Sequence, residues 1–345
     1  MATIGVPPHA DAPAAPLTRR RRFGDPAFRW TTLVVSVGLV VMLVLLLWVL
    51  ADGGWRAIRE FGLHFVIGRD WNPVAGRETY GALPFIFGTA VTSLIAMVLA
   101  MPIGVGVALF LNESGAGWIK NPLAVLVDLL AAIPSVVYGL WGLFVLVPLF
   151  DHTVEPWLSA SVGKVPVLGG LFHYQGPGGD MFTAGVILAI MILPIVTAVT
   201  REVVSVVSTE TREAAMALGA TRYETIRLGV LPTARPGIVG AGMLGLGRAL
   251  GETIAVALVI GNSTNISASL FKSGYTIPAV IANEFREATS AGVHRSALLF
   301  LALLLVLIAL GMASVSRLLV RRTARLMGDD VAAQEEAASS TLGLA

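Results

Sequence analysis

The chain has 345 residues, of which 55% are hydrophobic and only 13% are charged. Soluble domains average about 25% charged residues, so this composition excludes a soluble protein and indicates one that is integral to the membrane. The absence of cysteine excludes disulfides and thiolate metal sites, and the sequence indicates no cofactor. The net charge of +2 says little, because the placement of charge matters more than its sum in a membrane protein.

Six apolar stretches are long enough to cross a bilayer, which takes about 20 residues of helix. The sequence therefore predicts an all-α membrane protein with six transmembrane helices. They cover residues 30–51, 81–112, 122–150, 181–203, 236–261 and 296–316. The second and third stretches are longer than a bilayer requires, so each is expected to tilt or to include an interfacial segment.

Lysine and arginine counts predict the orientation of these spans. With the N-terminus inside, fifteen of these residues fall in inside segments and eight in outside segments. Cytoplasmic loops carry the excess of positive charge, so both termini are expected in the cytoplasm. The first apolar run lacks a small-residue cleavage site, which favours a retained span over a signal peptide. Residues 1–28 and 326–345 are expected to be disordered tails around a domain at 29–325.

Two polar side chains, Ser135 and Tyr138, lie near the middle of the third predicted span. They are candidates for a substrate path through the membrane. The alternative for Ser135 is local, because Pro134 frees a backbone carbonyl that a hydroxyl can satisfy. Beyond this span, residues 151–180 are rich in glycine and proline and are expected to form an external loop.

The loop at 208–235, between the fourth and fifth spans, begins with signals for a short helix. Ser208 or Thr209 can cap its start, and Gly219 is placed to end it. Each signal is weak alone and is compatible with an ordinary amphipathic loop.

A second helix is predicted in the same loop. Thr221 and Glu224 form the T-x-x-E pattern of a capping box, and Gly229 followed by Pro232 is expected to end the helix. The complete order of helix, sharp turn and helix favours a rigid knob that docks into a groove on a cytoplasmic partner.

Arg248 and Glu252 stand near the middle of the fifth predicted span. A charge there costs about 2.5–3.5 kcal/mol even on lenient insertion scales. Residues four apart lie on one face of a helix. The two charges are therefore interpreted as an ion pair that fixes helix or subunit packing, as an anion site on a translocation path, or as a proton relay. Arginine suits an anion site because its planar fork bonds phosphate oxygens in pairs.

Past the fifth span, residues 276–288 have the chemistry of a helix start. Thr276 can serve as the cap, and Pro278 falls in the first turn. A short external helix is predicted between the last two spans.

The stretch EAAMALGATRYETIRLGVLP, at 213–232, resembles the EAA loop of bacterial ABC-importer permeases. In that family the loop forms the coupling helices that sit in a cleft of the ATPase subunit. The resemblance covers about residues 31–325 and implies the type I (MetI-like) permease fold. The positions that match the pattern are Glu213, Ala214, Ala215, Gly219, Ile226, Leu231 and Pro232, and all of these except Ile226 are expected to couple to the ATPase.

Two further segments, YGALPFIFGTAVTS at 80–93 and AAIPSVVYGLWGLFVLVP at 131–148, resemble the phosphate-specific (Pst) permeases. RALGETIAV, at 248–256, is more similar to the PstC type than to the PstA type, which usually reads A-P after G-E-T. In this family the matching arginine and glutamate are associated with phosphate passage, which favours the anion-site interpretation of Arg248 and Glu252.

The resemblance also implies partners and a location. A PstA-type permease subunit would complete a heterodimer in the lipid of a bacterial plasma membrane. Two copies of a PstB-type ATPase and an extracytoplasmic phosphate-binding protein would complete the importer, without nucleic acid. The chain has no G-x-x-x-x-G-K-[ST] phosphate loop, so it is expected to be a non-catalytic pore subunit. A permease for sulfate or molybdate and a secondary transporter are the alternatives.

Overall fold

The structure is a computed structural model that describes residues 24–74, 76–113, 117–166, 169–174, 176–288 and 292–341, with side chains between residues 26 and 322. The chain divides into two units, Met1–Trp48 and Val49–Ala345. The first unit contains the beginning of α1 (Gly24–Phe61), whose apolar side chains are almost all exposed. A helix that is apolar all round is typical of a membrane span.

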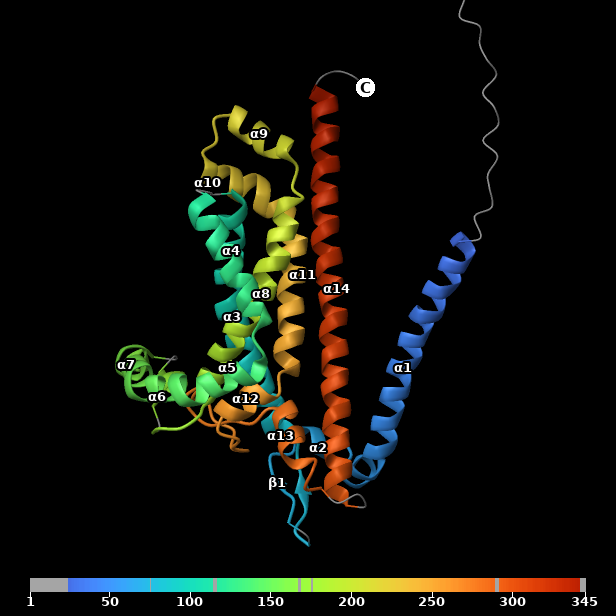
Figure 1. Ribbon diagram of the computed structural model, residues 1–345, viewed down its shortest axis with the longest axis vertical. Coiled ribbons are helices and arrows are strands. Elements are labelled where there is room, and N and C mark those ends of the chain that lie inside the picture. The colour runs from blue at the N-terminus through green and yellow to red at the C-terminus, as the bar shows by residue number, and fades with distance from the viewer. Residues whose placement is uncertain are drawn as a thin grey trace, which may run out of the picture. The chain divides into compact units, whose positions relative to one another are not determined.

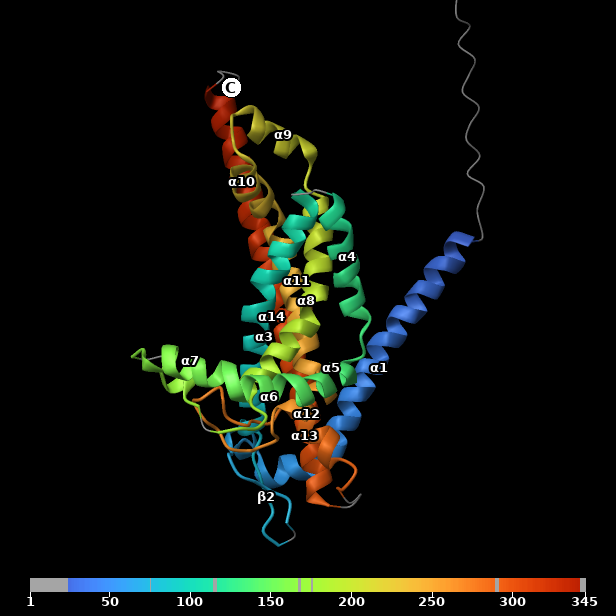
Figure 2. The same cartoon turned by 60° about the vertical axis from the view of Figure 1, so that its left-hand side comes forward.

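The second unit is a helical bundle. Its long helices run along one common direction (Figures 1 and 2). Among them α8 is central, because it packs against α3, α4 and α11 and is the most deeply buried. The long helices are α3 (Leu83–Glu113), α4 (Gly117–Ala132), α8 (Met181–Ser205), α11 (Leu231–Gly251) and α14 (Val293–Thr341).

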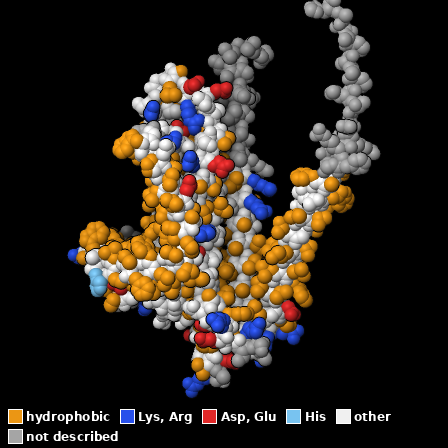
Figure 3. Space-filling model, viewed as in Figure 1, with side chains coloured by type: hydrophobic (Ala, Val, Ile, Leu, Met, Phe, Trp, Pro, Cys, Tyr) orange, Lys and Arg blue, Asp and Glu red, His pale blue; other side chains and the backbone are white. Residues whose placement is uncertain are grey.

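Side-chain chemistry divides the bundle into zones along this direction. On the face shown in Figure 3, Lys, Arg, Asp and Glu gather toward the two ends, and the stretch between them is mostly hydrophobic. Among the described residues, five helical stretches are long and apolar enough to cross a membrane: Pro26–Phe61, Leu83–Glu113, Ser135–Lys164, Met181–Ser205 and Val293–Arg322. These agree with the first, second, fourth and sixth predicted spans, whereas the third and fifth predicted spans differ.

The third predicted span, at 122–150, is not one continuous helix. α4 ends at Ala132, and the backbone at Pro134 is extended, with ψ at 142°. A proline pushes the residue before it out of the helical region, which accounts for the break. The following helical run lies across the bundle (Figure 2) and enters the stretch expected to be a loop at 151–180. It comprises α5 (Ser135–Trp141), the π-helical η1 (Gly142–Leu146), α6 (Val147–Leu149), the π-helical η2 (Phe150–Val154) and α7 (Glu155–Ser161), and the 3-10 turns η3 (Val162–Lys164) and η4 (Gly169–Phe172) follow it.

Buried carboxyl groups attach this crosswise run to the bundle. Asp180 caps α8 by accepting hydrogen bonds from the amide and hydroxyl of Thr183, at 2.9 and 2.7 Å. Glu155, only 1% exposed, is hydrogen-bonded to Asp180, and burial raises the pKa of Asp180 to about 6. Burial and mutual repulsion disfavour the ionisation of both carboxyl groups together. The two buried carboxyl groups thus lie where α7 meets the start of α8.

The fifth predicted span is also interrupted. α11 ends at Gly251, and Glu252 is extended, with ψ at 129°. A short helix, α12 (Ile254–Val259), follows. Glycine is a poor helix former, and here it stands at the end of the helical run.

The end of the bundle opposite α9 is built from small elements around an aromatic core. They are α2 (His64–Ile67), the antiparallel hairpin of β1 (Trp71–Asn72) and β2 (Thr79–Tyr80), and α13 (Ile277–Glu284). Glu284 joins them, since its Oε2 lies 2.9 Å from both Trp71 Nε1 and His294 Nε2. The predicted helix start is confirmed, because the Thr276 hydroxyl accepts a hydrogen bond from the amide of Ala279.

The structure describes only parts of the two predicted tails, residues 1–28 and 326–345. Residues 1–23 lie outside the described residues, and α1 already begins at Gly24. At the other end, the α14 helix continues to Thr341, through most of the segment that was expected to be a disordered tail from residue 326. This part of the helix contains four alanines and two glutamates, which are strong helix formers. Residues 342–345 lie outside the described residues.

Gly88 on α3 allows the backbone at Tyr275 to lie close to this helix. A methyl group at position 88 should prevent that close packing. A β-carbon there would overlap the carbonyl oxygen of Tyr275 and lie 2.9 Å from its carbon. Overpacking of this kind costs about 1–3 kcal/mol, so Gly88→Ala should lower the melting temperature of the detergent-solubilised protein.

Gly106→Ala, on the same helix, is the matched control. A β-carbon there meets nothing within 4 Å, and alanine is the better helix former. This variant should melt at or slightly above the wild-type temperature. Equal melting temperatures for the Gly88 and Gly106 variants would contradict the close packing of α3 on the Tyr275 segment.

Candidate functional site

The helix that carries Arg248 has a packed side and an open side. Gly237 and Gly245 face α8, where added β-carbons would lie 2.6 Å from Val203 Cγ2 and 3.0 Å from Val196 Cγ2. Arg248 is exposed, and added β-carbons at Gly247 and Gly251 would meet nothing within 4 Å. Small residues thus serve close packing on one side of α11, as in other membrane helix pairs. The other side leaves Arg248 uncovered by this chain.

The expectation that Arg248 and Glu252 share one helix face is wrong. Arg248 lies in the last turn of α11, whereas Glu252 lies beyond the helix end on extended backbone. Within the described part of the chain, no ion pair within 4.0 Å joins the two side chains. An internal ion pair that fixes the register of this helix therefore has no support in the geometry.

The break at Pro134 is repaired by Tyr138 and not by Ser135. Proline has no amide hydrogen, so the carbonyl of Leu130, four residues earlier, loses its helical partner. The Tyr138 hydroxyl donates to that carbonyl oxygen at 2.8 Å. Tyr138 thus has a clear structural role, and its buried ring holds the start of α5 against the end of α4.

The two helix breaks lie near each other. α5 packs against α12, and a β-carbon at Gly139 would lie 2.8 Å from the Cα of Ala255. The structure therefore packs α5, which carries Ser135 and Tyr138, against the short helix that follows Arg248 and Glu252 in the chain.

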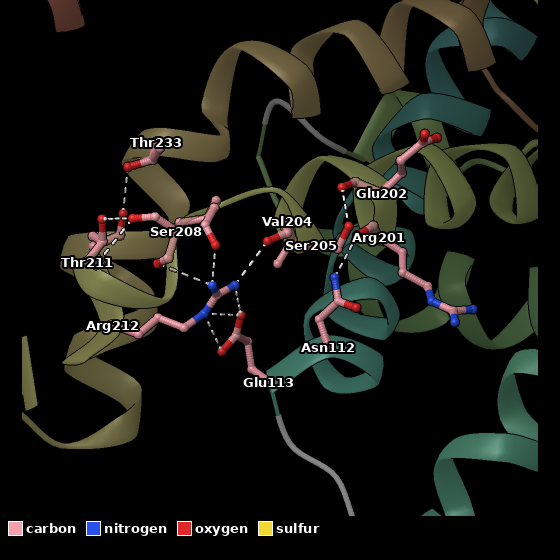
Figure 4. Close-up of polar contacts among 12 residues, drawn as sticks. Asn112, Glu113, Arg201, Glu202, Val204, Ser205, Ser208, Thr211, Arg212 and Thr233 are labelled. Atoms are coloured by element: carbon pink, nitrogen blue, oxygen red, sulfur yellow. Dashed lines mark hydrogen bonds and ion pairs between the residues drawn. The ribbon is translucent and has the colours of Figure 1, made fainter. Parts of the chain in front are cut away.

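A polar cavity of about 300 Å³ lies among α3, α4 and α8, toward the end of the bundle that carries α9. Asn112, Asp128, Thr197, Arg201 and Glu202 are among its lining residues. The Asn112 side chain donates to the Arg201 carbonyl at 2.6 Å, and Figure 4 shows the Arg201 guanidinium pointing away from that bond. The cavity places charges of both signs between α4 and its neighbours.

The predicted start and end of the first helix in the 208–235 loop are confirmed. α9 (Thr209–Ala217) is capped by Ser208, whose hydroxyl accepts from the Thr211 amide at 3.3 Å. Gly219 has φ at +85°, the left-handed conformation that ends many helices. Glu213 and Ala214 are exposed on this helix, and Ala215 is half-buried.

The predicted capping box is confirmed as well. Glu224 Oε2 accepts from the Thr221 amide and hydroxyl, both at 2.8 Å, and the Thr221 hydroxyl accepts from the Glu224 amide at 3.3 Å. These hydrogen bonds lower the pKa of the Glu224 carboxyl. The box starts α10 (Arg222–Glu224).

The predicted end of this second helix is wrong. Instead, α10 continues through the π-helical η5 (Thr225–Val230) into α11, with Pro232 in the first turn of α11. The wider π-helical turn bonds the Leu231 amide to the Ile226 carbonyl, and a proline is tolerated where its missing amide is not needed. One helical run therefore connects the loop to Arg248.

Large apolar side chains project from the 208–235 loop. Leu218 is 90% exposed, and Leu228 and Tyr223 are 71% and 67% exposed. Exposed apolar residues on a rigid turn are typical of a docking surface.

An ion pair that the sequence did not predict lies at the base of this loop. Arg212, directly before the E-A-A residues, forms an ion pair with Glu113 at the end of α3, with 2.7 Å between Nη2 and Oε1 (Figure 4). The two residues are far apart in the sequence, so no local pattern could reveal the pair. In the described residues, no group of His, Asp and Glu is arranged to hold a metal ion.

Comparison with known proteins decides the family. Residues 100–325 match the family described as "Binding-protein-dependent transport system inner membrane component". The chain belongs to this family. It is 44% identical over 301 residues to the phosphate transport system permease protein PstC of Pasteurella multocida, covering 87% of this chain and 93% of that protein. It is 45% identical over 297 residues to the same-named protein of Xylella fastidiosa (strain Temecula1), covering 86% and 89%.

The fold agrees with that membership. A crystal structure of a bacterial ABC transporter involved in the import of alginate matches with a TM-score of 0.56 at 16% identity, covering 87% of this chain and 98% of that chain. At this identity the likeness concerns the fold alone. The chain is thus a multi-pass membrane protein with the fold of an ABC-importer permease.

Gly219 provides a test of the loop as a docking element. An added β-carbon meets nothing within 4 Å, so any cost of substitution comes from the positive φ alone. Gly219→Val should insert in the membrane but lose most of its co-purification with the ATPase subunit, because β-branched residues avoid this conformation. Gly219→Asn should retain it, since asparagine tolerates left-handed backbone. Equal retention by both variants would contradict a role for the turn.

Proposed function

We propose that this chain is the transmembrane permease subunit of an ATP-driven inorganic phosphate importer. Relatives that are 44–45% identical over most of the chain carry the name of phosphate transport permeases. The proposal extends that role to this chain as one half of the translocation pore.

The observation that carries the proposed substrate path is the position of Arg248. It is exposed on the open side of α11, and no described side chain lies in ion-pair contact with it. In a membrane protein such a charge faces a cavity or a partner, because contact with lipid is costly. A guanidinium in this position can bind phosphate oxygens in pairs. Glu252, beyond the helix end, would offset the charge so that the anion can leave.

The remaining subunits follow from the 208–235 loop and the family. Its exposed apolar residues would dock on the ATPase, with Glu213, Ala214, Ala215 and Gly219 in the contact region. Leu231 and Pro232, at the start of α11, would pass its motion to the pore. A PstA-type permease would complete the pore, two PstB-type ATPase copies would drive it, and an external binding protein would deliver phosphate. ATP hydrolysis would belong to the ATPase copies.

We further propose six crossings of the plasma membrane, by α1, α3, α4, α8, α11 and α14, with both termini in the cytoplasm. α4 and α11 would make the third and fifth crossings. The crosswise run from α5 to α7 would then lie at the outer side, because it begins where α4 ends.

A reporter that is active only in the cytoplasm tests this topology. Fused after Ala345 it should be active, and inserted at Gly178 it should be silent. Activity at Gly178 with silence after Ala345 would invert the orientation, and the 208–235 loop could then not meet an ATPase.

Uptake by the purified complex tests the function. Proteoliposomes containing this chain, its permease partner and the ATPase, with binding protein added outside, should accumulate labelled phosphate only with internal ATP. Excess unlabelled sulfate or molybdate should not compete, which separates phosphate from other oxyanions. Uptake by this chain alone that an uncoupler dissipates would instead indicate a secondary transporter.

Charge and shape at Arg248 can be tested separately in this assay. Arg248→Gln should lower uptake by at least about tenfold, since a hydrogen bond to a charged group contributes about 1.5–3 kcal/mol. Arg248→Lys should be intermediate, because it keeps the charge but loses the planar fork. Glu252→Gln should reduce transport less than Arg248→Gln.

Arg317→Gln is the control, because Arg317 is an exposed arginine on another helix, α14. It should leave uptake near the wild-type value. Complex yield should be unchanged in all these variants. If the double variant of Arg248→Gln and Glu252→Gln recovers both yield and uptake lost in the single variants, the two residues form an ion pair and not an anion site.

A further inference from the structure

Arg212 holds the 208–235 loop through a network that reaches two helices of the bundle. Its guanidinium meets Glu113 in a fork, with Nη2 and Nε at 2.7 and 3.1 Å from Oε1 and Nε at 3.3 Å from Oε2 (Figure 4). Both side chains are largely covered, at 19% exposed for Arg212 and 12% for Glu113. A paired, partly buried fork of this kind is among the stronger polar contacts and fixes geometry as well as distance.

The same guanidinium bonds the end of α8. Nη2 donates to the Val204 carbonyl at 3.0 Å, and Nη1 donates to the carbonyl of Val207. Carbonyls in the last turn of a helix have no helical partner, so a cation there completes the helix. Arg212 therefore connects α9, the end of α3 and the end of α8 at one point.

Little else attaches α9 to the bundle. None of its side chains is buried, and its main packing partner is η5, which belongs to the same loop. Apolar packing beneath the loop comes instead from Val204, Val207, Val230 and Ala234, outside α9. The direct polar connection between α9 and the transmembrane helices is thus concentrated in Arg212.

We propose that the Arg212–Glu113 pair is the mechanical link that passes movement of a docked ATPase from α9 to α3 and α8. Both are positioning residues for coupling. The inference rests on the proposed function, since it assumes that the ATPase binds the 208–235 loop. Apolar contacts can slide under load, whereas the two-pronged ion pair keeps α9 at a fixed orientation to the helices it pulls.

The first test is the amount of phosphate imported per ATP hydrolysed. Arg212→Gln and Glu113→Gln should each assemble with the ATPase in wild-type yield and hydrolyse ATP, but import about tenfold less phosphate per ATP. The double variant should be no worse than either single variant, because both changes break one link. Arg212→Lys should recover part of the ratio, because it keeps the charge. Arg317→Gln, the exposed arginine on α14, is again the control and should keep the wild-type ratio.

A second measurement does not depend on phosphate. The chain has no cysteine, so spin labels on Ala217→Cys and Phe110→Cys would report one distance between α9 and α3. In the ATPase-bound complex this distance should be narrowly distributed and should broaden in Arg212→Gln. If the wild-type complex hydrolyses ATP without importing phosphate, the proposed function is rejected. The spin-label distance would still test the Arg212–Glu113 link in that case. An unchanged distribution, or a loss of import that only follows complex yield, would overturn the link.

Discussion

A peptide group inside a bilayer has no water to bond, so the protein itself must repair every interruption of a transmembrane helix. This chain interrupts two helical runs, at Pro134 and at Glu252. At the first, the Tyr138 hydroxyl donates a hydrogen bond to the Leu130 carbonyl, to which the proline cannot donate. The repair fixes where α5 leaves the bundle, and therefore where α5 meets α12. The constraint on backbone hydrogen bonds thus determines how the segment after Pro134 packs against α12, which follows Glu252 in the chain.

Hydropathy and capping patterns predicted much of this architecture, because both are local. Four predicted spans agree with candidate membrane helices, and the Ser208 cap, the Gly219 turn and the Thr221 capping box all form as the sequence indicates. Local patterns failed where two tendencies compete. Pro232 was expected to stop a helix, but a π-helical turn accommodates it and the run continues.

The candidate site was less predictable than the fold. The sequence singled out Arg248 and Glu252, but their relation depended on a helix that ends at Gly251, and helix ends inside apolar runs carry weak signals. The Arg212–Glu113 pair joins residues that are separated in the sequence by α4 and α8. Its formation depends on how α3 and α8 pack, which no pattern near either residue contains.

The connections of the 208–235 loop determine which helices can move together. The helical run from Arg222 to Gly251 joins the loop directly to α11, and Arg212 joins it to α3 and α8. Because α8 also packs closely on α3 and α11, these three helices and the loop form one tightly connected group. α4 packs less extensively on this group, since Val127 is its only buried residue among those described and a cavity is lined by α3, α4 and α8. Among these helices, α4 therefore has the least buried packing to hold it in place, and it leads through Pro134 to Tyr138.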